Sequence, residues 1–270
     1  MINVIDFLRY VLLGILQGFT EPLPISSSGH LVLMKTLMNM PTLDYFLEIV
    51  LHFASLIAII LLFRKRITRL IVGNFHYVFK RDKAYAADAR YALLIVIGVI
   101  PAGLAGLLFR SFFEGLLTVV TVGISLIVTG SFLMLVQRQS VENTKTELTM
   151  LDALSIGAAQ VVALLPGISR SGATYVGGLI RRVKFEAVVE FSFMLYIPIS
   201  VATMLLAARD VNSFSTQPTT ALVAAFIAGV FATYFAFKWF VHTVKQGNLK
   251  YFAYYCFAVG ALTLVVSLLT

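Results

Sequence analysis

Apolar runs, each close to 20 residues long, alternate along the chain with short polar segments that are rich in lysine and arginine. About 20 apolar residues is the length that an α-helix needs to cross the hydrocarbon core of a bilayer. Six such runs are predicted as membrane spans, at residues 44–63, 91–109, 115–136, 188–207, 220–241 and 251–269. The pattern predicts an all-α polytopic membrane protein.

Two further apolar stretches are each interrupted near the middle. Four short helical arms are predicted, at residues 6–20, 28–38, 150–165 and 171–180. Pro22 and Pro24 separate the first pair of arms, and Pro166 and Gly167 separate the second. Because each arm is too short to span alone, we expect two re-entrant helical hairpins that enter the membrane and return on the same side. A single kinked span is the alternative for the first pair.

The distribution of basic residues predicts the orientation. Lysine and arginine gather in the segments 64–90, 137–147, 181–184 and 245–250, and such clusters mark cytoplasmic loops. The first hairpin then opens to the outside and the second to the inside, each followed by three spans. This is an inverted-topology repeat, with hairpins meeting near the membrane midplane. We interpret the chain as one integral membrane domain over residues 1–270, with pseudo-repeat halves at 1–136 and 150–270.

Composition excludes several other classes of protein. Of the 270 residues, 59% are hydrophobic and 13% charged, and a soluble domain cannot bury that much apolar surface. The net charge of +8 does not indicate nucleic-acid binding, because the basic residues flank the apolar spans. The single cysteine, Cys256, has no partner for a disulfide within the chain. No cleaved signal peptide is predicted, because the first residues lack a basic segment and a cleavage site.

The break in the first hairpin, QGFTEPLPISSSGHL at residues 17–31, is the strongest candidate for a site. Polar, helix-breaking backbone at membrane depth is tolerated only where protein or a water-filled cavity surrounds it. Gln17 and Glu21 are four residues apart and share a helix face. His30 follows three serines, Ser26, Ser27 and Ser28, and this combination offers nucleophilic attack or proton transfer.

The second break, QVVALLPGISRSGAT at residues 160–174, matches the first after a shift of 143 positions (from Gln17 to Gln160). Its one basic residue, Arg170, carries a planar fork of donors that suits phosphate oxygens. The surrounding phosphate-binding candidates are Ser169, Ser171, Gly172 and Thr174, and Ser26 and Ser28 of the first break are candidates for the same role. A simpler alternative is that Arg170 only neutralises Glu21 or Glu190.

Two more acidic residues, Glu48 and Glu190, lie inside predicted spans, where ionisable groups are costly and often functional. Either direct catalysis or support of the hairpin breaks, through hydrogen bonds to their backbone amides, would explain them. His52, four residues after Glu48, is predicted to be a buried core histidine. His76 and His242 are assigned no chemistry.

Glu21 with PISSSGH and the later PGISRSGAT closely resemble the undecaprenyl-diphosphatase family of bacterial membrane enzymes tied to bacitracin resistance. The resemblance covers nearly the whole chain. It implies a phosphatase in the bacterial cell membrane that converts undecaprenyl diphosphate to undecaprenyl phosphate and inorganic phosphate, which recycles the carrier lipid for cell-wall synthesis. It also implies a divalent cation, Mg²⁺ or Ca²⁺, a homodimer, and access from the outer side. The matching functional positions are Gln17, Glu21, Ser26, Ser27, His30, Ser169, Arg170 and Thr174.

Several alternatives stay open at this point. Gln17 stands where many relatives have glutamate, and a neutral amide binds a divalent cation more weakly than a carboxylate, so a metal held by Gln17 and Glu21 is less secure. The nucleophile is predicted to be Ser27, with His30 or Glu21 as its base, but His30 itself or water are alternatives. The rival function is a polyprenyl-phosphate flippase or secondary transporter, because inverted repeats with midplane sites are typical of transporters.

Overall fold

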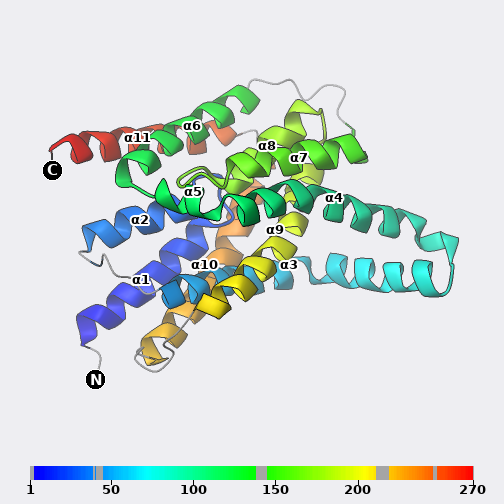
Figure 1. Cartoon of the computed structure of the whole chain (residues 1–270), viewed down its shortest axis with the longest axis horizontal. Helices are drawn as coiled ribbons and strands as arrows, with labels where there is room; N and C mark the ends of the chain where they lie inside the picture. The colour runs from blue at the N-terminus through cyan, green and yellow to red at the C-terminus, as the bar shows by residue number, and fades with distance from the viewer. Residues whose placement is uncertain are drawn as a thin grey trace.

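A computed structural model describes residues 3–38, 40, 45–137, 145–210, 219–245 and 248–269, and these residues are overwhelmingly helical (Figure 1). The helices are α1 (Val4–Thr20), α2 (Ser27–Leu37), α3 (Tyr45–Phe79), α4 (Ala86–Leu108), α5 (Arg110–Gly115), α6 (Val119–Gln137), α7 (Met150–Val162), α8 (Arg170–Ile180), α9 (Phe185–Asp210), α10 (Thr219–Lys245) and α11 (Leu249–Leu269), with a short 3₁₀ turn at Lys83–Tyr85. Within the described residues the only β-pairing is an isolated bridge between Lys145 and Val183.

Six helices in the described part of the chain, namely α3, α4, α6, α9, α10 and α11, are long and apolar enough to cross a membrane. Each of them contains most of one of the six predicted spans. Their outer faces carry many exposed leucine, valine and phenylalanine side chains, as expected where lipid rather than water is the solvent. The chain is therefore a multi-pass helical membrane protein, and the all-α prediction is confirmed.

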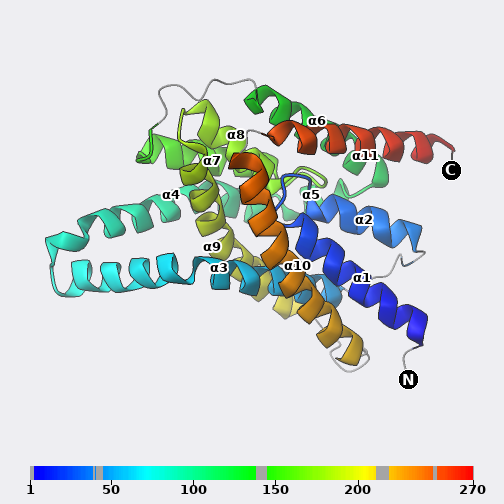
Figure 2. The ribbon, with the colours of Figure 1, turned by 180° about the vertical axis from the view of Figure 1, so that it is seen from behind.

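Two predicted boundaries were wrong. The segment 64–90 was expected to be a loop, yet α3 continues as one helix to Phe79 and projects with the start of α4 as an arm beyond the other helices (Figures 1 and 2). Contacts with α4 stabilise this extension, because Arg66 and Arg69 of α3 both form ion pairs with the buried Asp88. The turn expected at 110–114 is the short helix α5. Most of the predicted polar loop 137–147, and Asp44 at the start of the first predicted span, lie outside the described residues.

The two broken stretches form helix pairs, α1 with α2 and α7 with α8, which contact each other as hairpins do. Ser26 and Ser169 are the N-cap residues of the second helix of each pair, and each side chain accepts a hydrogen bond from a backbone N–H in the first turn. Gly167 allows the second break because its φ is +89° and a Cβ there would lie 2.8 Å from Val122 Cα.

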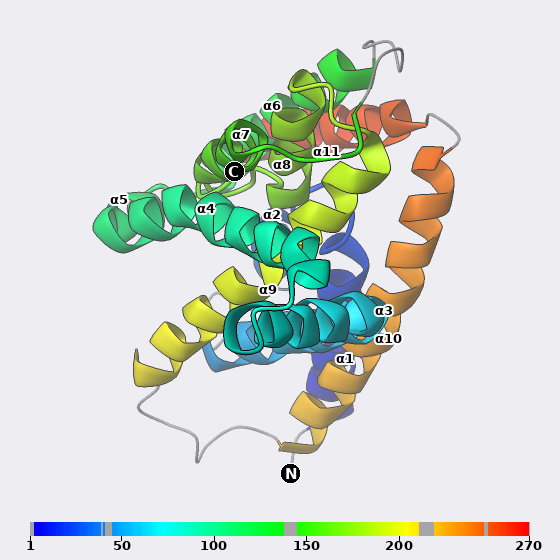
Figure 3. The same ribbon diagram turned by 90° about the vertical axis from the view of Figure 1, so that its right-hand side faces the viewer.

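The ends of the second pair are tied together at Asp152, which is buried near the start of α7. Its carboxylate accepts a hydrogen bond of 3.1 Å from Arg181 Nε, just beyond α8, and lies 2.6 Å from Lys145 Nζ. The start of α7 and the end of α8 are therefore close together, and Figure 3 shows α7 and α8 next to each other in the upper part of the view.

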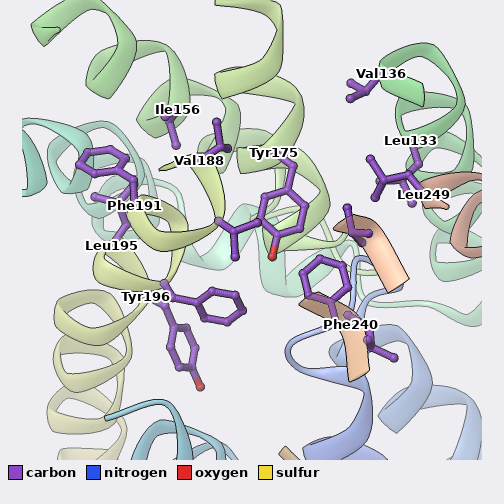
Figure 4. Close-up of a cluster of buried hydrophobic side chains, with 14 of the residues drawn as sticks. Leu133, Val136, Ile156, Tyr175, Val188, Phe191, Leu195, Tyr196, Phe240 and Leu249 are labelled. Carbon is purple, nitrogen blue, oxygen red and sulfur yellow. The ribbon is translucent and has the colours of Figure 1, made fainter. Parts of the chain in front are cut away.

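Glycines allow close packing between helices of the two parts of the chain. A Cβ on Gly14 of α1 would lie 2.3 Å from the carbonyl oxygen of Ala225 in α10, and one on Gly157 of α7 would lie 2.3 Å from that of Gly98 in α4. Small residues let membrane helices approach to backbone contact. Next to the breaks, the aromatic core stacks Tyr175 of α8 on Phe240 of α10, with ring centroids 5.6 Å apart (Figure 4).

Candidate active site

Glu21, which caps the C-terminus of α1, is the centre of a buried polar network. Its carboxylate accepts hydrogen bonds from Gln17 Nε2 at 2.8 Å, from Ser27 Oγ at 2.6 Å and from Arg170 Nη2 at 3.3 Å. These partners come from α1, from the start of α2 and from the start of α8. Side chains from both breaks thus meet in one buried polar network.

Ser27 is the first residue of α2, and its hydroxyl donates to Glu21. A carboxylate that already accepts the hydroxyl hydrogen is placed to take that proton when the oxygen attacks. The predicted alternative base, His30, is directed elsewhere. Its Nδ1 lies 2.7 Å from the carbonyl oxygen of Ser26, and its Nε2 lies 2.7 Å from the hydroxyl of Tyr255 in α11.

Arg170 pairs with Glu21 and retains an open donor. Its guanidinium lies over the ring of Tyr196, with Cζ 4.2 Å from the centroid, and near Phe193 at 5.7 Å. Nη1 is buried and has no hydrogen-bond partner among the described residues. A buried donor without an acceptor is costly, so this position favours an anionic oxygen supplied from outside the chain. Both predicted roles of Arg170, charge pairing and anion contact, are compatible with this geometry.

The other predicted hydroxyls mainly hold the two breaks in place. Ser171 Oγ donates to the carbonyl oxygen of Leu23 at 3.0 Å and lies 3.1 Å from Ser169 Oγ, which accepts from Gly172 N. Thr174 Oγ1 lies 2.6 Å from Ser192 Oγ of α9. In the first break, Ser26 Oγ and Ser28 Oγ are 3.4 Å apart.

The two supporting glutamates lie in other ion pairs. Glu48 is paired with Lys35 of α2, and Glu190 accepts a hydrogen bond of 2.8 Å from Arg66 of α3. These partners are side chains on neighbouring helices, whereas the sequence suggested backbone amides of the breaks. Glu190 therefore links α9 to α3, and Glu48 links α3 to α2.

His52 was wrongly predicted to be a buried core histidine. Its side chain is 38% exposed, and Nδ1 lies 3.0 Å from Gln17 Nε2 and 3.7 Å from the Glu21 carboxylate. Its spacing of four residues from Glu48 was the only sign in the sequence that it shares the inner face of α3. Tyr196 and Tyr255 carry no sequence pattern that singles them out.

A divalent cation has a limited set of protein ligands here. Within the described residues there is no group of three or more histidine, cysteine or acidic side chains that could hold a metal ion. Gln17 Oε1 is buried without a hydrogen-bond partner in that part of the chain, next to Glu21. Hard cations prefer oxygen ligands, so these two residues would supply only part of the coordination of a divalent cation.

Taken together, the six spans and the buried carboxylate, hydroxyl and guanidinium define an integral membrane protein with an internal site for an anionic group. The family described as bacitracin resistance protein BacA matches residues 10–262, and the chain belongs to this family. It is 41% identical over 261 residues to undecaprenyl-diphosphatase 1 of Bacillus cereus, which covers 96% of this chain and 97% of the relative. It is 38% identical over 271 residues to undecaprenyl-diphosphatase of Oceanobacillus iheyensis, covering 97% and 98% of the two chains.

Proposed function

We propose that Ser27 of this membrane phosphatase attacks the terminal phosphorus of undecaprenyl diphosphate and that Glu21 accepts its proton. The chain is an undecaprenyl-diphosphatase, as its family and its nearly full-length relatives indicate. It releases undecaprenyl phosphate and inorganic phosphate. Bacitracin resistance and a role in cell-wall synthesis and cell shape follow from this activity.

The single observation that supports this mechanism is the hydrogen bond of 2.6 Å from Ser27 Oγ to Glu21. In the first step a bond forms between Ser27 Oγ and phosphorus, the bond from phosphorus to the bridging oxygen breaks, and undecaprenyl phosphate leaves. Glu21 passes the serine proton to the departing undecaprenyl phosphate and is a carboxylate again. In the second step water attacks phosphorus, Glu21 takes a proton from that water and gives it to Ser27 Oγ as the bond from phosphorus to Oγ breaks. Inorganic phosphate leaves and the Ser27 hydroxyl is restored. Arg170, with Nη1 open, offsets the negative charge that builds on the phosphoryl oxygens.

The resemblance also implies Mg²⁺ or Ca²⁺. We place Gln17 Oε1 and Glu21 as its protein ligands, with the remaining oxygens from the diphosphate. When bound, such a cation would neutralise diphosphate charge.

We further propose the inverted repeat and the two re-entrant hairpins. Equivalent contacts support them: α1 packs on α10 of the other half, and α7 packs on α4 of the first half. Gly14 and Gly157, which make these two contacts, are separated by 143 positions (157 − 14), the same shift that superimposes the two motifs. The bacterial cell membrane as location, access from the outer side and the homodimer remain predictions from the resemblance.

A flippase or transporter is not favoured, because the full-length relatives are phosphatases by name and a carboxylate–hydroxyl pair is suited to group transfer. The test is phosphate release from undecaprenyl diphosphate by the protein purified in detergent. We expect turnover by the wild type, a loss of at least about 10²-fold in Ser27→Ala and Glu21→Gln, and normal turnover in the control Ser131→Ala, whose exposed hydroxyl donates only within α6. Lipid binding without phosphate release would instead support a transporter.

A further inference from the structure

His30 has both ring nitrogens occupied, and the partners determine which one carries the hydrogen. Nδ1 lies 2.7 Å from the Ser26 carbonyl oxygen, which can only accept, so Nδ1 is the protonated nitrogen. Nε2 then presents its lone pair and accepts a hydrogen bond from the Tyr255 hydroxyl at 2.7 Å. The two rings are also stacked, with centroids 5.5 Å apart and planes 9° apart.

Ser26, the other partner of His30, has a strained backbone. Its φ is 67° and its ψ is 93°, a conformation that residues other than glycine rarely adopt. Its carbonyl oxygen accepts two hydrogen bonds, one from the His30 backbone N–H at 3.2 Å and one from the imidazole. Strain of this kind persists only where surrounding contacts hold it. The His30 ring is one of these contacts, and the residue that follows the strained position is Ser27.

We propose that Tyr255 is a positioning residue for the phosphatase reaction. By donating to Nε2, Tyr255 keeps His30 neutral with the hydrogen on Nδ1. His30 in turn holds the Ser26 carbonyl, and this fixes the turn that directs Ser27 Oγ to Glu21. In this arrangement His30 is not the group that attacks phosphorus, because the lone pair on Nε2 accepts the hydrogen bond from Tyr255 of α11. The inference rests on the proposed attack by Ser27.

The test is Tyr255→Phe, which keeps the stacked ring and removes only the hydroxyl. Because Tyr255 acts on the geometry of attack and touches no substrate, we expect kcat to fall by about tenfold with KM nearly unchanged. The matched control is Tyr254→Phe, one residue earlier on the same helix with an exposed side chain, and it should retain wild-type kcat. A wild-type kcat in Tyr255→Phe would overturn the proposal.

A double-mutant comparison separates positioning through His30 from a general loss of structure. If Tyr255 acts only through the imidazole, Tyr255→Phe should cause no further loss in a His30→Gln background. If Tyr255→Phe lowered kcat by the same factor in the wild type and in the His30→Gln variant, the proposal would be contradicted.

A ¹⁵N spectrum of histidine-labelled protein reports the tautomer directly and independently of which residue attacks. We expect the His30 signal to show a protonated Nδ1 and an unprotonated Nε2 in the wild type, and to change in Tyr255→Phe but not in Tyr254→Phe. An unchanged His30 signal in Tyr255→Phe would refute the Tyr255 contact. If instead Ser27→Ala kept full turnover while the His30 signal behaved as expected, the proposed nucleophile would be wrong and the Tyr255–His30 contact would stand.

Discussion

At the residue scale, the two amino groups of Arg170 have different surroundings. Nη2 donates to Glu21, whereas Nη1 is buried without a partner in the described chain. The planar ring of Tyr196 stacks on the guanidinium and fixes its orientation. A lysine can supply the positive charge at this position, but it cannot donate in two fixed directions or stack in the same way.

Arg170→Lys is therefore expected to lose most activity, on the order of 10² or more in kcat, because the second donor would contact phosphoryl oxygens most strongly in the transition state. Arg181→Lys, at an arginine that pairs with Asp152 outside the site, serves as the control and should retain activity. Steady-state phosphate release measures both. Near-normal turnover by Arg170→Lys would leave Arg170 only as a charge partner of Glu21.

Gln17 tests the proposed cation site. Its Nε2 donates to Glu21 in the present structure, so Gln17→Glu would place two carboxylates side by side and create a stronger oxygen site for a divalent ion. We expect a lower concentration of Mg²⁺ or Ca²⁺ for the half-maximal rate, measured by titration after chelation. An unchanged titration would remove position 17 from the cation site.

Much of the site was predictable from the sequence, because Glu21, Ser27 and Arg170 are polar residues beside helix breaks in apolar surroundings. The pairing was not. Whether Glu21 or His30 approaches Ser27 depends on the backbone conformation of Ser26. Its φ is positive, and no sequence pattern predicts that. Tyr255 lies in the other half of the chain, in a segment for which the sequence predicts only a membrane span.

At the scale of elements, glycine contacts set how closely the helices approach. The α7–α4 contact leaves no room for a side chain at Gly157. Gly157→Ala should destabilise the protein by about 1–3 kcal/mol, the usual cost of overpacking, as measured by thermal unfolding in detergent. Gly103→Ala is the matched control on α4, because a Cβ there meets nothing within 4 Å and alanine favours a helix. Equal unfolding temperatures for the two variants would contradict this packing.

The ends of helices were predictable where an apolar run of spanning length stops at a cluster of charged residues, and less predictable elsewhere. The basic run that begins at Arg64 was read as the end of the first span, yet α3 continues to Phe79. Lysine and arginine favour a helix and do not end one. Arg66 and Arg69 also pair with Asp88 of α4, a contact between segments that local sequence does not reveal.

At the scale of the whole molecule, the proposed orientation places α5 outside and the arm formed by α3 and α4 inside. A cysteine at Glu114, an exposed residue of α5, should then react with an impermeant thiol reagent in intact cells. A cysteine at Lys83, in the 3₁₀ turn of the arm, should react only after the membrane is opened. Both cysteines are introduced into a Cys256→Ser variant, so that each protein carries a single cysteine. The reverse labelling would invert the proposed topology.

In the proposed mechanism Ser27, with Glu21 as its base, carries the transferred phosphoryl group. The most direct measurement is a rapid acid quench of the purified enzyme with undecaprenyl diphosphate labelled on its terminal phosphate, followed by mapping of the labelled peptide. Phosphoserine survives acid, whereas phosphohistidine is lost in acid and survives base. We predict acid-stable label on Ser27, and none in Ser27→Ala. Label on His30 that is lost in acid and kept in base would contradict attack by Ser27.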